Sequence, residues 1–415
     1  MELVSIRIEE SHHAAGRVRL VGEVAYDDRP GTEAYWLEVD EEYAGSLSLS
    51  GSPWLAWLLP LASTLGQKLR IGAPVDPLLA ENAPRIMKTW TTWYRKRFPH
   101  LRAVPIEAEV AIAPPAPLAR ETGAFFSGGI DSFYTVLGNL EREDRERFPK
   151  IDRLLWVGGF DLPIESPEEE FVRLRARLSA AARDLGLRFF DVRTNLRQTR
   201  FREARWGNLS HGPALAGVGL ALERRFETFY IAATHERGEI RPWGSHPDTD
   251  PLLSTRSTRF VHDGLGIRRS DKTERISRSD VAMRSLHVCF RSGTADNCCD
   301  CRKCLLAMLT LEVFGLMSRC SVFPRPLDLE RVRRVYLRSP SYWRLYTDIL
   351  VRARKAGRKD IAKAIAACRL RYLYTKPAIT VIDWLAEQRG LWRVARRLRP
   401  AFLEGYSIRK YASGL

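Results

Sequence analysis

The feature that most constrains the fold is an alternation of short apolar runs and helical patterns that begins near residue 123. Apolar runs of strand length that alternate with helices are typical of a parallel sheet covered on both faces. In such a sheet a ligand binds beyond the carboxyl ends of the strands. We therefore predict an α/β fold with a doubly wound parallel sheet. The expected strands are Ala124–Phe126, Arg153–Phe160, Leu187–Val192 and Glu227–Thr234, and the expected helices are Asp131–Glu143, Pro167–Leu185 and Gly212–Arg225.

The regions on either side of this core have different patterns. Before it, the period-2 segments SIRIEE, RVRLVGEVAY and AYWLEVD predict antiparallel strands, and a helix is expected at Ala80–Tyr94. A further strand, VPIEAEVAIA, leads to Pro114–Pro117, where prolines break regular structure. After about Phe323 the chain is helical and rich in arginine. We predict a β-rich domain over residues 1–117, an α/β core over 118–323 and a basic helical domain over 324–415.

Composition excludes several classes of protein. No run of about 18 apolar residues is present, so we expect no membrane span. The first residues, MELVSIRIEE, lack the basic-then-apolar order of a secretory signal. Seven cysteines, four of them within residues 298–304, argue against a disulfide framework. We expect a reduced, cytoplasmic protein.

The stretch SGGIDS at Ser127–Ser132 lies between the first expected strand of the core and its first helix. Glycines at 128 and 129 let the backbone approach a ligand and direct its N–H groups toward it. The helix start adds a partial positive charge, so we predict that phosphate binds there. Asp131 is a candidate partner for Mg²⁺, although it could also be only a carboxylate at a helix start. The stretch has neither the lysine of a GxxxxGK[ST] loop nor the GxGxxG spacing of dinucleotide-binding folds.

A second signal is Cys289 followed by NCCDCRKC at Asn297–Cys304. Four thiolates at this spacing can close a tetrahedral zinc site, and we name Cys289, Cys298, Cys301 and Cys304 as the ligands. The C-x2-C-x2-C run is also found at iron–sulfur clusters. We disfavour this alternative because no further cysteine completes the ferredoxin spacing. The adjacent Cys299 is a rival ligand, whereas Cys320 and Cys368 are expected to be buried apolar residues.

Together these motifs resemble a known group of enzymes. SGGIDS resembles the SGGxDS motif of the ATP pyrophosphatases, or PP-loop enzymes. The cysteines resemble the zinc motif of one PP-loop family, the 7-cyano-7-deazaguanine synthases, with Cys299 in place of a glycine. The resemblance covers about Gly123–Leu305, and Lys272 in RRSDKTERI looks like the family's lysine beside the nucleotide. It differs in the extensions at both ends and in the loop His235–Thr255, where we would place the substrate.

The resemblance implies a reaction and a set of cofactors. The loop would grip the pyrophosphate half of ATP in the presence of Mg²⁺, and AMP would be transferred to the substrate with release of pyrophosphate. Zinc would be structural. Asp131 and Lys272 would act in catalysis, since a cation can stabilise charge that develops on the phosphates. Enlarged PP-loop proteins also resemble components of phage-defence systems. The implied ATP-binding residues are Ser127, Gly128, Gly129, Ile130, Asp131 and Ser132.

Four further residues are candidate substrate contacts. His211 precedes an expected helix, and Thr234 and His235 follow the fourth expected strand, at the ligand edge of the sheet. His246 lies in a Gly/Ser/Pro-containing loop that could close over a substrate. A structural role is the alternative for each of them.

The last region carries 22 Lys and Arg against 7 Asp and Glu over residues 325–415, nearly all of the net charge of +16. A helical basic surface with interleaved Trp and Tyr could bind nucleic acid or an acidic protein partner. A solvated basic face explains the same composition. The sequence does not decide whether the protein forms a homodimer.

These observations lead to one functional expectation and two alternatives. We expect adenylation of a carboxylate or amide-like oxygen, followed by attack of a nitrogen nucleophile, on a deazapurine-type or related acceptor that is a small molecule or a macromolecule. The first alternative is a tRNA-modifying PP-loop enzyme of the thiolation or lysidine type, which in the thiolation case would use a reactive cysteine. The second is a protein that binds ATP as a sensor or scaffold without turnover.

Overall fold

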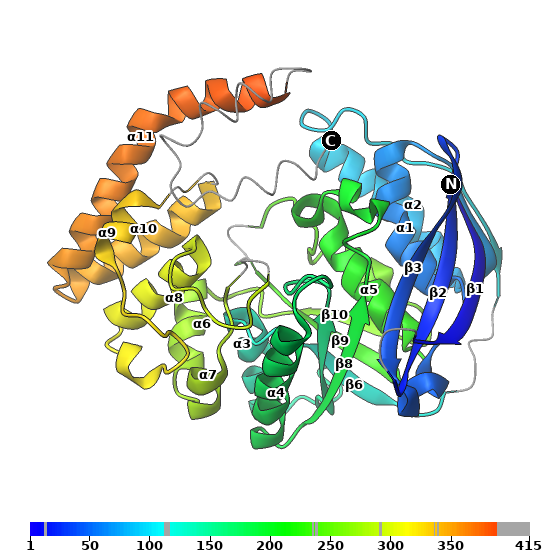
Figure 1. The fold of residues 1–415 in the computed structure, drawn as a ribbon, viewed down its shortest axis with the longest axis horizontal. Helices are drawn as coiled ribbons and strands as arrows, with labels where there is room; N and C mark the ends of the chain where they lie inside the picture. Colours follow the sequence, from blue (N-terminus) through cyan, green and yellow to red (C-terminus); the bar gives the residue numbers. More distant parts are fainter. Residues whose placement is uncertain are drawn as a thin grey trace. The chain divides into compact units, whose positions relative to one another are not determined.

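The computed structural model describes residues 1–11, 15–111, 117–234, 236, 240–289, 293–335, 337 and 340–387 (Figure 1). The chain forms two compact units, of which the first comprises Met1–Arg268 and the second begins at Arg269. The predicted boundaries near residues 117 and 323 fall inside these units, and they stay predictions. Within the described residues, no helix combines the length and the apolar character needed to cross a membrane.

The first unit is built on one ten-stranded sheet in the order β10-β9-β6-β7-β8-β3-β2-β1-β4-β5. Most neighbouring pairs are parallel, and the antiparallel pairs are β8–β3, β3–β2 and β2–β1. The predicted α/β class with a mainly parallel sheet is confirmed at this level. The strands are β1 (Glu2–Glu10), β2 (Arg17–Tyr26), β3 (Arg29–Asp40), β4 (Leu69–Val75), β5 (Ile106–Val110), β6 (Glu121–Phe125), β7 (Arg153–Gly158), β8 (Arg188–Thr194), β9 (Phe226–Ala232) and β10 (Arg259–Asp263).

In the parallel part of the sheet, the order in which the chain adds its strands reverses beside β6. The chain runs from β6 to β7 and β8 on one side, then crosses back to place β9 and β10 on the other side. Helices α3 (Ile130–Glu141), α4 (Glu168–Asp184) and α5 (His211–Ala221) make these crossovers. Because parallel crossovers are right-handed, the reversal puts α5 on the face opposite to α3 and α4 (Figure 1). This arrangement is compatible with a Rossmann-like core whose switch point lies between β6 and β9.

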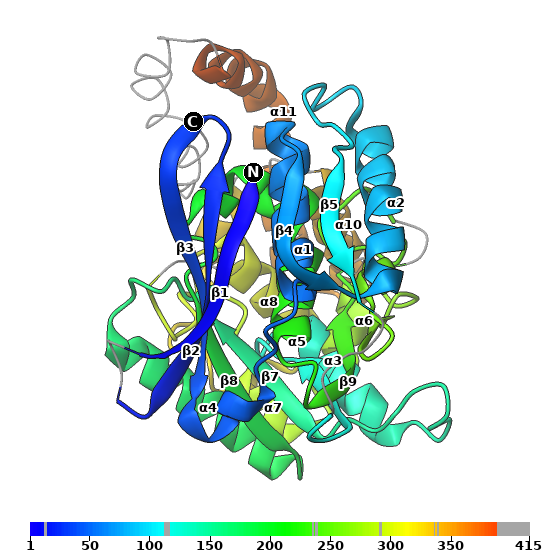
Figure 2. The same ribbon diagram turned by 90° about the vertical axis from the view of Figure 1, so that its right-hand side faces the viewer.

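The N-terminal strands extend this same sheet. The register pairs Leu37 and Glu38 of β3 with Thr194 and Arg193 of β8, so β1–β3 continue the sheet as antiparallel strands, as predicted (Figure 2). Helix α1 (Ser52–Leu65) packs against α5, and the Trp57 indole donates a hydrogen bond to the Ala214 carbonyl at 3.0 Å. The other elements of this unit are α2 (Pro77–Tyr94), the 3₁₀ helices η1 (Glu41–Ser46), η2 (Arg200–Ala204) and η5 (Pro251–Leu253), and the π-helix η3 (Trp206–Ser210).

The described part of the second unit is helical, as predicted for the chain beyond Phe323. Its apolar core joins α8 to α9, α10 and α11 through residues that include Leu309, Val332, Tyr346 and Ile365. The elements are α6 (Arg269–Ile276), α7 (Asp280–Ser285), α8 (Arg302–Val313), η6 (Met317–Arg319), α9 (Leu329–Arg334), α10 (Pro340–Lys355) and α11 (Lys359–Glu387).

Candidate phosphate loop and metal centre

The loop that contains SGGIDS follows β6, the strand beside which the strand order reverses. The residues of β6 pair on one side with β7, where Phe125 lies opposite Leu155, and on the other with β9, where Ala124 lies opposite Tyr230. The turn therefore begins at the carboxyl end of β6, next to the switch point. In doubly wound sheets this is where ligands bind.

The backbone of the turn requires glycine and leaves donors available. Gly128 has φ of +71°, in the left-handed region that favours glycine. Gly129 is the N-cap of α3 in extended conformation, and it offers no side-chain cap to the first-turn N–H groups. The Ser132 hydroxyl donates to the Gly129 carbonyl at 3.0 Å, which closes the first turn. Free N–H groups at a helix start can bind an anion.

The predicted loop residues differ in exposure. Ser127, Gly129 and Asp131 are partly exposed, whereas Ile130 is 2% exposed and Ser132 is 5% exposed. Ile130 thus anchors the turn in the core, and only its backbone can take part in binding. Ser127 and Asp131 have side chains that a ligand could reach.

Lys272 belongs to α6 of the second unit, where its side chain is 1% exposed. A surface lysine surrounded by solvent is therefore excluded. Burying an ammonium group is costly unless a partner compensates its charge. Its contact with phosphates stays a prediction.

The four candidate substrate residues lie in different environments. Thr234 is exposed just beyond β9, and His211 begins α5 with its ring 5.1 Å from that of Trp206. His246 is 4% exposed, and its ring centroid lies 4.5 Å from that of Trp93. This burial lowers the pKa of His246 because it disfavours the imidazolium form. His235 lies outside the described residues.

A buried polar cluster next to His246 was not predicted from the sequence. The Asp250 carboxylate is fully buried. It accepts hydrogen bonds from the Ser245 hydroxyl at 2.6 Å and from the backbone N–H of His246 at 3.1 Å. Its Oδ2 lies 2.8 Å from Nδ1 of His262, in strand β10. The available signal was the short run RFVHD, which was not recognised as a strand.

The four predicted metal ligands converge in the second unit. The Sγ atoms of Cys289, Cys298, Cys301 and Cys304 all lie within 4.8 Å of one another, and those of Cys298 and Cys304 are 3.9 Å apart. Zinc–sulfur bonds of about 2.3 Å in a tetrahedron place the sulfurs about 3.8 Å apart. The donor set therefore fits a metal ion such as zinc.

Hydrogen bonds order the segment of residues 297–304 and join it to Cys289. The N–H of Cys301 donates to the Cys298 sulfur at 3.3 Å, and the N–H of Cys304 donates to the Cys301 sulfur at 3.5 Å. The buried Asn297 amide oxygen accepts from the N–H of Cys289 at 3.1 Å. These contacts preorganise the thiolates, as outer-shell partners do in metal sites.

The negative charge of several thiolates in this cluster would be stabilised by a bound cation. Hydrogen bonds with the other three thiols of the cluster lower the pKa of Cys298. In the same way, hydrogen bonds with its own three neighbouring thiols raise the pKa of Cys304. Several thiolates at this separation repel one another unless a positive charge lies between them. Four thiolates around one ion leave no open position, which is the pattern of a structural site.

Cys299, the rival ligand, is directed away from the cluster. Its backbone has φ of +57°, and its thiol donates to the Asn297 carbonyl at 3.5 Å. This left-handed conformation explains why glycine suits the position.

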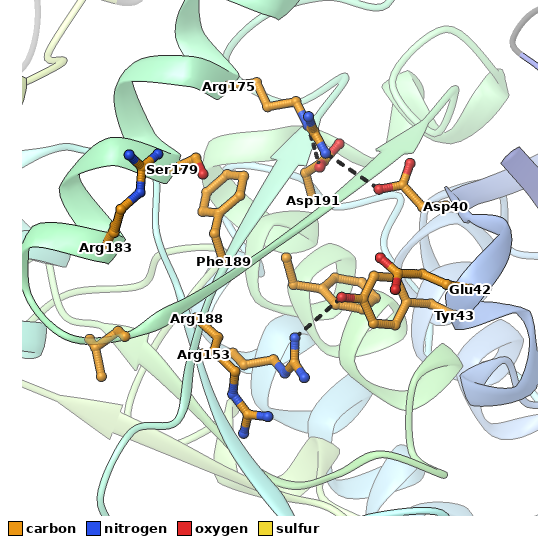
Figure 3. Close-up of a pocket in the computed structure, with 12 residues that line it drawn as sticks. Asp40, Glu42, Tyr43, Arg153, Arg175, Ser179, Arg183, Arg188, Phe189 and Asp191 are labelled. Carbon is orange, nitrogen blue, oxygen red and sulfur yellow. Dashed lines mark hydrogen bonds and ion pairs between the residues drawn. The ribbon is translucent and has the colours of Figure 1, made fainter. Parts of the chain in front are cut away.

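A cavity of about 470 Å³ lies at the other end of the strands (Figure 3). It is lined from the first residues of β7 and β8 by Arg153 and Arg188, and from α4 by Arg175. Arg175 is paired with Asp191 at 2.6 Å, and Arg153 and Arg188 share Glu121 at 2.5 and 2.9 Å. These arginines have carboxylate partners, so this cavity is a weaker candidate for an anion than the turn after β6.

Comparisons with protein-family models, with curated proteins and with solved structures find no match.

Proposed function

We propose that the protein is an ATP pyrophosphatase-type ligase that adenylates an oxygen of its acceptor and then transfers the activated group to a nitrogen nucleophile. The observation that carries the proposal is the glycine turn after β6. Gly128 has a left-handed backbone, and the helix that follows begins without a side-chain cap. The turn also lies where the strand order reverses. A nucleotide phosphate is the natural ligand of such a turn.

The proposed chemistry has two steps. An acceptor oxygen attacks the α-phosphorus of ATP, the bond to the bridging oxygen breaks, and pyrophosphate leaves. A nitrogen nucleophile then attacks the adenylated carbon, the carbon–oxygen bond breaks, and AMP leaves. N–H groups at the start of α3 would hold the departing pyrophosphate, with Ser127 beside them.

Asp131 would orient a Mg²⁺ ion on the phosphates. Its carboxylate is partly exposed in the first turn of α3, and hard cations prefer such oxygen ligands. Lys272 would neutralise charge that develops on the phosphates. Zinc on the four cysteines would stabilise the second unit and take no part in the reaction.

The state of the remaining thiols favours this reaction over thiolation. Burial raises the pKa of Cys320 to about 11 and that of Cys368 to about 12, and it also raises the pKa of Cys299. A catalytic cysteine needs a lowered pKa. The other four cysteines are the candidate metal ligands, and with a metal ion bound none of their thiolates would be a free nucleophile.

The substrate class follows from the resemblance of the motifs. A deazapurine carboxylic acid with ammonia or an amine is the first acceptor and nucleophile to test, and a defence or modification pathway is the proposed setting. The basic C-terminal region would bring in a nucleic acid or an acidic protein if the acceptor is a macromolecule.

The test is to incubate the protein with ATP, Mg²⁺, a deazapurine acid and ammonium, and to measure the nucleotide products. We expect AMP and pyrophosphate in equal amounts, and Asp131→Asn should lower their formation about 100-fold or more. Glu143→Gln, an exposed carboxylate beyond the end of α3, is the matched control and should leave the rate unchanged. Accumulation of ADP in place of AMP would overturn the proposal.

A further inference from the structure

The buried pair of Asp250 and His262 has the geometry of an oriented base. Oδ2 of Asp250 lies 2.8 Å from Nδ1 of His262, and the two side chains are 0% and 4% exposed. A carboxylate on one ring nitrogen keeps the proton on that nitrogen, which leaves the other, Nε2, as the basic atom. In the described part of the chain, no group hydrogen-bonds to Nε2.

The carboxylate is held in place on three sides. The Ser245 hydroxyl and the His246 N–H both donate to it. Its Oδ1 also lies against the start of α5, where a Cβ on Gly212 would come within 2.3 Å of it. The positive end of that eleven-residue helix favours a negative charge at this position. Asp250 is therefore fixed as a charged partner of one imidazole.

The pair lies at the same level of the sheet as the phosphate turn. His262 is opposite Ile231 of β9, and the preceding residue of β9, Tyr230, is opposite Ala124 of β6. The backbone of His262 is thus level with the end of β6 and two strands away, or about 10 Å at the usual strand spacing. Its side chain is on the same face as Phe260, which packs near Gly219 of α5. A substrate across the switch point could reach both places.

We propose that His262 is the general base of the second step, and that Asp250 positions it. As the nitrogen nucleophile attacks the adenylated carbon, Nε2 takes the proton that the nitrogen must lose, the bond to AMP breaks, and Asp250 stabilises the imidazolium that forms. This inference rests on the proposed function and adds a residue to it.

The experiment separates the two steps with the full-length protein, ATP, Mg²⁺ and a deazapurine acid. Exchange of labelled pyrophosphate into ATP reports the adenylation, and amide formation from ammonium reports the transfer. We expect His262→Gln to keep exchange within about threefold while amide formation falls about 100-fold or more. Asp250→Asn should show a smaller loss of the same kind, and His100→Gln is the control outside the site.

Two further readouts distinguish a base from a structural residue. Wild-type amide formation should fall at low pH, as expected when a general base acts, and His262→Gln should lose this dependence. Hydroxylamine is an α-effect nucleophile that is largely unprotonated near neutral pH, so it depends less on a general base than ammonium does. It should restore hydroxamate formation in His262→Gln to near the wild-type level. Retained exchange also shows that the variant is folded.

Other outcomes decide against the inference. If His262→Gln forms amide at the wild-type rate, or loses exchange and amide formation equally, then His262 is not the base. If the wild-type protein shows no exchange at all with any acid tested, the proposed function fails and this inference fails with it.

Discussion

The phosphate turn of the first unit and the cysteine cluster of the second are different kinds of candidate site. In the cluster, four side-chain sulfurs within 4.8 Å supply a complete donor set. In the turn, most of the candidate binding groups are backbone N–H groups, which are candidates because of their place beside the reversal of strand order at β6. A site made of side chains can be identified from residue type and spacing. A site made of backbone has to be supported by its place in the fold.

The largest effect should come from removing a candidate metal ligand. Cys304 is fully buried at the start of α8, so Cys304→Ser should reduce bound zinc from one ion per chain to near none and unfold the second unit at a lower denaturant concentration. Metal-dependent folding of small sites is worth on the order of 10 kcal/mol. Elemental analysis and chemical denaturation measure both quantities. Cys320→Ser, outside the cluster, should leave the zinc content unchanged.

The turn should respond to a change that leaves every side chain of the site intact. Gly128→Ala places a Cβ on a left-handed residue at a strain of about 1–2 kcal/mol, so ATP binding should weaken about tenfold or more. Gly138→Ala, in the helix that follows the turn, is the matched control, because no atom of the described residues outside that helix's own backbone lies within 4 Å of the new Cβ. Calorimetric titration with ATP compares them. Equal affinities would show that the turn does not bind phosphate through its backbone.

The position between two of the candidate metal ligands, Cys298 and Cys301, should tolerate loss of its thiol. Cys299 has φ of +57°, so Cys299→Gly should relieve strain and stabilise the second unit by up to about 1 kcal/mol. Zinc content should stay at one ion per chain. A loss of zinc in this variant would make Cys299 a ligand.

The smallest effect concerns pH. The pKa of His246 is lowered by burial, so below about pH 6.5 the unfolded chain binds a proton that the folded protein excludes. Wild-type stability should therefore fall more steeply from about pH 7 to pH 5 than that of His246→Gln. Urea unfolding at each pH gives the two slopes, and parallel slopes would mean that His246 titrates normally.

The elements predicted from the sequence are those with a regular spacing of apolar residues or with turn residues at their ends. Strands β1–β3 and β6–β9 and helices α2–α5 lie close to the expected ranges. Helix α1 was not predicted because twelve of its fourteen residues are buried, which removes the polar face that reveals a helix. The joining of β3 to β8 was also missed, since a pairing between residues more than 150 positions apart leaves no local pattern.

The candidate sites divide in the same way. Cys289 and Cys304 were identified by residue type and spacing, and the turn by its two glycines at a strand end. Asp250 and His262 were not paired, because they are twelve positions apart and His262 belongs to a strand that was not predicted. Contacts of this kind are created by the fold.

The junction of β3 with β8 has a consequence for any attempt to divide the first unit. A chain shortened to begin at residue 118 would expose the backbone edge of β8, and it would uncover α5 where Gly217 lies against Trp57. An open edge beside an uncovered apolar surface promotes aggregation. The first 117 residues therefore cover the rest of the first unit, which should not remain monomeric without them.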